Sequence, residues 1–170
     1  MKMRTQIITL GMAGTALAML VGGAGLITGT RLSTSLEASV KASAALQASQ
    51  RADMMHDAVR GDTLLGMVGA LRAEPAAIEA ARKDLDGHAR TFREALAQLA
   101  ALPLDDASRQ ALTRVEPLVE SYLDAARQTL QASRVTQPPS SAATDQFQQA
   151  FEVLENEMAA LSQAIERRGQ

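Results

Sequence analysis

The sequence predicts an all-α protein in which an N-terminal transmembrane helix continues into an up-down-up-down four-helix bundle. A long run without ionisable side chains opens the chain, and beyond it apolar residues recur every three or four positions in segments separated by prolines. Apolar content is 46% but aromatic content is only 2%. The core must therefore be built from Leu, Ala, Met and Val on helices, because a sheet would use more β-branched and aromatic residues.

Residues 1–30 are expected to be a membrane anchor. Thr5–Thr30 contains no ionisable side chain, and Lys2 and Arg4 precede it. A helix of that length crosses a hydrocarbon core of roughly 30 Å at about 1.5 Å per residue. A cleaved signal peptide is the alternative, since small residues such as Ala16-Leu17-Ala18 resemble a cleavage site. We favour the anchor because the run exceeds the roughly 7–15 residues of a signal's apolar region.

The charges that flank this run predict its orientation. Lys2 and Arg4 lie before it, whereas the first charged residues after it are of mixed sign. The basic bias places the N-terminus in the cytoplasm. We therefore expect residues 1–30 to be a single-pass anchor and residues 31–170 to form one domain outside the cytoplasm.

The first two helices of the bundle are delimited by a proline. The first runs from the membrane to about Arg72 and stops at Glu74-Pro75, because proline disfavours helix in the preceding residue and suits a helix's first turn. The second runs from Pro75 to about Leu102. Its packed face is marked by four residues at every seventh position: Ile78, Leu85, Phe92 and Leu99.

The third and fourth helices are separated by the longest break. Asp105 is the N-cap candidate of a helix over residues 106–133. Pro117 should kink this helix or start it late, because its ring clashes with the carbonyl four residues back. A loop is expected at 134–143, and Thr144 is the N-cap candidate of the last helix.

Several classes of function are excluded by composition. The chain has no cysteine, which excludes disulfides, thiol catalysis, zinc ribbons and covalently attached haem. The net charge is −2 and no basic stripe is interleaved with aromatic residues, so nucleic acid is not an expected partner. Serine-hydrolase, phosphate-loop and metalloprotease motifs are absent. We expect no enzyme activity and no cofactor.

The two histidines do not indicate a metal site. Folding the first two helices back at Pro75 aligns Gly61 with about His88. His56 and His88 then differ in height by on the order of 7 Å at about 1.5 Å per residue. His88 is more simply interpreted as a residue of the packed face, and the methionines as core filler rather than haem ligands.

The residues richest in chemistry lie in the first helix of the bundle. Asp57 and Gly61 continue the stripe of Met54, Leu64 and Val68. A carboxylate and a glycine without a side chain therefore occupy two positions where the helical periodicity predicts Leu. An unpaired buried carboxylate is costly, so we expect Arg60, Arg90 or Arg93 to neutralise Asp57. A small ligand with its own carboxylate or amine would replace one half of that pair. The predicted ligand site is therefore Asp57, Arg60, Gly61, Arg90 and Arg93.

Simpler interpretations of the same residues stay open. The segment 52–62 is equally typical of a solvated helix face with a packing glycine. A pair between Asp57 and an arginine is also typical of a structural contact that fixes the register of a bundle. The arginines themselves are then surface residues with Asp or Glu partners.

Several segments of the chain, taken together, are similar to one known family. They are the anchor with its basic start, Ala52–Asp62, His88–Leu96, Ala101–Asp105, Val115-Glu116-Pro117 with Tyr122, and Phe151–Glu155. In this combination the chain resembles the N-terminal region of bacterial methyl-accepting chemotaxis receptors. Those receptors carry a four-helix-bundle ligand-binding domain between two membrane helices.

The resemblance implies a function and a location. The chain would be the sensory part of a receptor in the bacterial inner membrane, with a periplasmic bundle, truncated before the second membrane span. It would bind a small solute and transmit a signal across the membrane. A homodimer is implied, paired along the first helices at Leu32, Leu36, Val40 and Gln47. The alternative is a membrane-tethered structural or interaction bundle without a small ligand.

Overall fold

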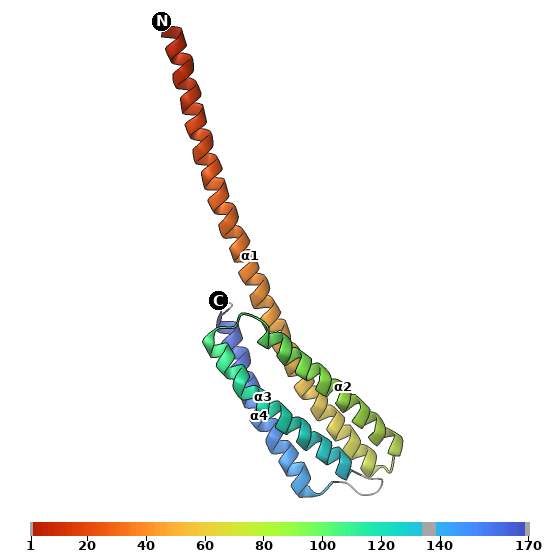
Figure 1. Cartoon of the computed structure of the whole chain (residues 1–170). Coiled ribbons are helices and arrows are strands. Elements are labelled where there is room, and N and C mark those ends of the chain that lie inside the picture. Colours follow the sequence, from red (N-terminus) through yellow and green to blue (C-terminus); the bar gives the residue numbers. More distant parts are fainter. Residues whose placement is uncertain (1, 134–138, 169–170) are drawn as a thin grey trace. The chain divides into compact units, whose positions relative to one another are not determined.

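The protein is helical throughout the part of the chain that the structure describes (Figure 1). The structure, a computed structural model, describes residues 2–133 and 139–168, with side chains placed for 36–133 and 139–167. The four helices are α1 (Lys2–Leu71), α2 (Pro75–Ala100), α3 (Asp106–Ala132) and α4 (Ser141–Arg168). No strand occurs among these residues, and the predicted all-α class is confirmed.

The chain divides into two compact units, residues 1–40 and 41–170. The predicted anchor, residues 1–30, lies outside the residues whose side chains are described. In the described part of the chain, no helix is both long enough and apolar enough to cross a membrane. Within the second unit, α2, α3 and α4 follow the end of α1 and alternate in direction (Figure 1).

The core of the second unit follows the predicted faces of α2, α3 and α4. All four heptad-spaced residues of α2 are buried. The apolar residues that recur every three or four positions on α3 and α4 are buried as well: Leu112, Val115, Val119, Tyr122, Ala126 and Leu130 on α3, and Phe147, Phe151, Leu154, Met158, Leu161 and Ile165 on α4. The largest fully buried side chains of this core are Tyr122, Phe92 and Phe147. Burial of such side chains is the main favourable term for folding, at roughly 1.5–3 kcal/mol each. The sequence pattern was correct here because each helix has one apolar face.

The face that α1 buries is not its apolar stripe. Met54, Leu64 and Val68 are exposed, as are Leu65 and Leu71. Small and polar residues are buried instead: Ala45, Ala48, Ser49, Ala52, His56, Val59, Asp62, Thr63 and Ala70. Small side chains allow α1 to lie close to its neighbours. The expectation that Asp57 interrupts a buried apolar stripe was therefore wrong, and Asp57 is itself exposed.

The turn between α1 and α2 ends the helix at the predicted position. The amide of Glu74 donates to the carbonyl of Gly69 (2.8 Å) and that of Ala73 to Ala70 (3.2 Å). This is the bonding pattern of a Schellman motif, which usually places glycine where Ala73 has φ 57°. Pro75 is then the first residue of α2, as predicted.

The starts of α3 and α4 bear out one predicted cap and correct another. Asp105 accepts a hydrogen bond from the amide of Ser108 (2.8 Å), so it is the N-cap of α3. The helix continues through Pro117, which is exposed, and the alternative of a late start was wrong. The last helix starts at Ser141 rather than near Thr144, because the Ser140 hydroxyl caps it by accepting from the amide of Ala143 (3.3 Å). Part of the predicted loop, 134–138, lies outside the described residues.

Candidate functional site

The residues of the predicted ligand site have separate environments. Asp57 is exposed and makes no ion pair among the described side chains. The Arg60 guanidinium lies over the Phe151 ring, 4.2 Å from its centroid. Arg93 forms a two-point ion pair with Glu120 of α3 (2.7 and 2.6 Å), and this contact raises the pKa of Arg93 and lowers the pKa of Glu120.

The other two predicted residues also lie apart from Asp57's expected pair. Arg90 is exposed and lines a shallow groove on α2 with Arg82 and Asp86, and a Cβ built on Gly61 meets no atom within 4 Å. The expected pair between Asp57 and an arginine does not form among the described side chains, because Arg60 and Arg93 contact Phe151 and Glu120 instead. Ligand binding at these residues stays a prediction.

A buried cluster of polar and aromatic residues, which the sequence pattern does not predict, surrounds His56. His56 is 2% exposed and stacks on Phe151 of α4, with ring centroids 4.3 Å apart. Tyr122 of α3 lies 5.1 Å from the same imidazole and donates its hydroxyl proton to the His56 carbonyl (3.0 Å). One turn of α1 thus contacts both α3 and α4. Spacing on α1 alone gives no signal for it.

A second buried polar contact joins α1 to α2. Asp62 is 6% exposed, and its Oδ2 lies 2.7 Å from Nδ1 of His88. Burial raises the pKa of Asp62, and the hydrogen bond from His88 acts in the opposite direction. The pair agrees with the predicted register, which placed Gly61 beside His88. The contact gives the buried Asp62 carboxylate a hydrogen-bond partner, and without one its burial would destabilise the folded state.

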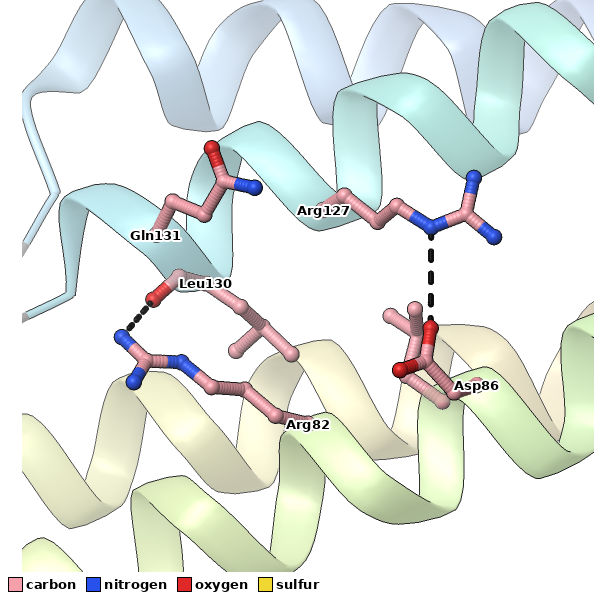
Figure 2. Close-up of a pocket in the computed structure, with 6 residues that line it drawn as sticks. Arg82, Asp86, Arg127, Leu130 and Gln131 are labelled. Carbon is pink, nitrogen blue, oxygen red and sulfur yellow. Dashed lines mark hydrogen bonds and ion pairs between the residues drawn. The ribbon is translucent and has the colours of Figure 1, made fainter.

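The best candidate for a ligand site is a groove between α2 and α3 (Figure 2). Its volume is about 170 Å³, and we call it the α2–α3 groove; it is lined by Arg82, Leu85, Asp86, Arg127, Leu130 and Gln131. Leu85 and Leu130 are buried core residues that contribute its apolar wall. The four polar side chains surround this wall, two from each helix.

The local sequence explains why these side chains meet. Arg82 and Asp86 are four residues apart on α2 and flank the core residue Leu85. Arg127 and Gln131 have the same spacing on α3 and flank Leu130. Residues four apart share a helix face, so each pair projects at the edge of the packed seam. The sequence marks each pair by its position beside a core leucine, but whether the two pairs meet depends on the register between the two helices.

The arginines of the groove are held less tightly than Arg93. Nε of Arg127 lies 3.7 Å from Asp86, and its Nη1 lies 3.4 Å from Asp124 on its own helix. Nη2 of Arg82 donates to the Leu130 carbonyl (2.9 Å), while its Nη1 is 3.6 Å from Glu79. Contacts of 3.6 Å or more are too long for hydrogen bonds. Both guanidiniums therefore keep donors that a ligand anion can accept from.

Among the described residues, no group of three or more His, Asp or Glu side chains is placed to hold a metal ion. In comparisons with protein-family models, curated proteins and solved structures, the chain matched none.

Proposed function

We propose that this chain is the sensory part of a bacterial methyl-accepting chemotaxis receptor, and that it acts by binding a small solute rather than by catalysis. Residues 1–30 anchor it in the inner membrane with the N-terminus in the cytoplasm, and the bundle lies in the periplasm. The observation that carries the proposal is the length of α1. This one helix, Lys2–Leu71, contains both the uncharged run and the first helix of the bundle.

The α2–α3 groove is the proposed ligand site. Its volume of about 170 Å³ is below the roughly 300–1,000 Å³ of pockets for drug-sized ligands, so it suits a small solute. Arg82 and Arg127 favour a carboxylate, which matches the fork of a guanidinium. Leu85 and Leu130 favour a short apolar body. A bound carboxylate would replace the exposed Asp86 at Arg127 and join α2 to α3 more tightly.

A chimeric receptor tests this function. The chain is fused to the kinase-coupling region of an established chemoreceptor, and kinase activity is followed while acetate, lactate and succinate are titrated. We expect a saturable response to at least one carboxylate. Arg127→Gln should raise the half-maximal concentration by about tenfold or more, since a charged hydrogen bond contributes roughly 1.5–3 kcal/mol.

Arg114→Gln is the matched control, because Arg114 is also on α3 and also pairs with a carboxylate, that of Glu157 (2.9 Å), away from the groove. It should leave the response unchanged. An equal loss in both variants would remove the groove as the site. Absence of any response, with the chimera folded and in the membrane, would contradict the sensory function.

The second candidate is a membrane-tethered structural or interaction bundle without a small ligand. It is favoured by the exposed apolar residues of α1, which we call the α1 outer face: Met54, Leu64, Leu65, Val68 and Leu71. Exposed apolar clusters of this kind mark surfaces that contact other proteins. This candidate predicts that no small carboxylate binds the chain.

In either role we propose a parallel homodimer paired along α1. Leu36 and Val40 are 59% and 68% exposed, and Gln47 is exposed as well. Because the chain has no cysteine, Val40→Cys introduces a single thiol. We expect this variant to form a disulfide-linked dimer in membranes. Val153→Cys should not, although Val153 is also exposed (43%), because it lies on α4; equal crosslinking of the two variants would argue against pairing along α1.

A further inference from the structure

His56 is enclosed by aromatic rings in the core of the bundle. Its imidazole lies nearly parallel to the Phe151 ring, with an interplanar angle of 8°, and is tilted against Tyr122. Its Nε2 atom is buried and has no hydrogen-bond partner in the described structure. A neutral imidazole tolerates this environment, whereas an imidazolium needs acceptors for both nitrogens.

The charges that act on His56 come from α1 and α4. Burial is the largest effect and lowers the pKa of His56; Asp57, the backbone of Phe151, Asp53 and Glu155 raise this pKa to a smaller extent. All three carboxylates are exposed, so water and salt weaken their attraction.

The remaining neighbours do not stabilise a cation. Arg60 lies against the same Phe151 ring and is itself positive. From α3, Tyr122 contacts the imidazole, and burial raises the pKa of its hydroxyl, so that it stays protonated. From α2, His88 is directed to Asp62. The imidazolium is favoured only by the exposed carboxylates and the Phe151 backbone, and burial outweighs both.

We propose that His56 is a proton-operated switch that loosens the packing of α1 against α3 and α4 when the surrounding medium is acidified. The added proton makes the imidazole a cation with a donor at Nε2 that the core does not satisfy. The exposed carboxylates of Asp53 and Asp57, on the same helix, offer acceptors outside the core. The imidazolium leaves the Phe151 ring to reach them, and the contact with Tyr122 is lost with it.

The direction of the effect follows from proton binding in the folded and unfolded states. The unfolded chain protonates His56 near its ordinary pKa of 6.5, whereas burial lowers the pKa of the folded state. As the pH falls below about 6.5, the unfolded state gains a proton that the folded state resists, so stability decreases. For one proton the unfolding equilibrium constant rises by up to about tenfold per pH unit. Above about pH 7.5 the group contributes no pH dependence.

The test uses the full chain in detergent-containing buffer, unfolded with urea at several pH values between about 5.5 and 7.5. Tyr122 is the only tyrosine and the chain has no tryptophan, so near-ultraviolet circular dichroism and fluorescence report on the contact with His56. The wild type should lose stability across this range. His56→Gln, which cannot take up a proton, should lose less.

His88→Gln is the matched control, because His88 is the other of the two histidines and is partly exposed beside Asp62. It should keep the pH dependence of the wild type. The proposal is overturned if His56→Gln retains the full dependence, or if His88→Gln alone removes it.

The wild-type chain supplies a second measurement that does not require a folded variant. Without denaturant, the near-ultraviolet signal of Tyr122 should decrease reversibly on acidification below about pH 6.5 while far-ultraviolet dichroism keeps its helical form. The proton breaks one packing contact and leaves the helices intact. A Tyr122 signal that stays constant down to about pH 5 would refute the switch.

Discussion

Tyr122 of α3 donates a hydrogen bond from its buried hydroxyl to the backbone carbonyl of His56 in α1, at 3.0 Å. Burial raises the pKa of this hydroxyl, so it remains a donor at all ordinary pH values. Tyr122→Phe removes the donor and leaves the ring in place. We expect a loss of about 0.5–1.5 kcal/mol, the usual net contribution of a neutral hydrogen bond.

Urea unfolding followed by far-ultraviolet circular dichroism measures this loss. Leu123→Ala is the reference for a packing defect at the neighbouring buried position, where about 2–5 kcal/mol is expected because a cavity forms. A Tyr122→Phe variant as unstable as Leu123→Ala would mean that the ring has moved and that more than a hydrogen bond was lost.

Ala73→Gly should stabilise the protein. Ala73 has φ 57°, a left-handed conformation that costs an L-residue roughly 1–2 kcal/mol and costs glycine almost nothing. Glycine also loses more entropy on folding, so the net gain should be about 0.5–1 kcal/mol. Ala101→Gly is the control, since Ala101 has φ −74° and gains nothing from glycine. Its melting temperature should fall or stay equal, and an equal rise in both variants would contradict the explanation.

The ion pair between Arg93 and Glu120 should contribute little despite its short distances. Both side chains are well exposed, at 39% and 52%, so the interaction is screened by water. A double-mutant cycle with Arg93→Ala and Glu120→Ala should give a coupling below about 1 kcal/mol. Because the pairing lowers the pKa of Glu120, the coupling is present above about pH 4.5 and is lost as the pH falls below that value.

A larger coupling that persists in about 1 M salt would show that the pair is better shielded than its exposure indicates.

The helices could be predicted from the sequence where one apolar face determines the packing. The heptad positions of α2 and the Asp105 cap required no information from other helices. In α1 the same reasoning failed. Two different faces compete for the core in that helix, and the buried one is made of alanines, Ser49 and His56 rather than the larger Met54 and Leu64.

Close approach of helices explains why the smaller face is buried. A side chain at Gly66 would overlap Leu130, and one at Gly69 would lie 3.1 Å from Ala77. Neither contact can be inferred from hydrophobic periodicity, because the periodicity of α1 gives no information about the space between α1 and its neighbours. The α2–α3 groove also depends on packing between helices, since it forms only when the register of α2 and α3 brings Arg82 and Arg127 together.

Three glycine substitutions distinguish packing glycines from those without a structural role. A Cβ at Gly61 or Gly87 meets no atom within 4 Å, so replacing either glycine by alanine should add up to about 1 kcal/mol of stability through helix propensity. At Gly66 the added methyl group would overlap Leu130 and lie 3.2 Å from Ala81. The propensity gain is then opposed by overpacking, and we expect Gly66→Ala to be no more stable than the wild type.

The same variants distinguish the two candidate ligand sites, the α2–α3 groove and the level of Asp57 and Gly61 on α1. Leu130 lines the α2–α3 groove, so Gly66→Ala should also change the response of the chimeric receptor to carboxylates by displacing that side chain. Gly61→Ala should leave the response unchanged, because Gly61 does not line the groove. If Gly61→Ala instead abolishes the response while raising the melting temperature, the solute binds at the level of Asp57 and Gly61, as the sequence alone predicted.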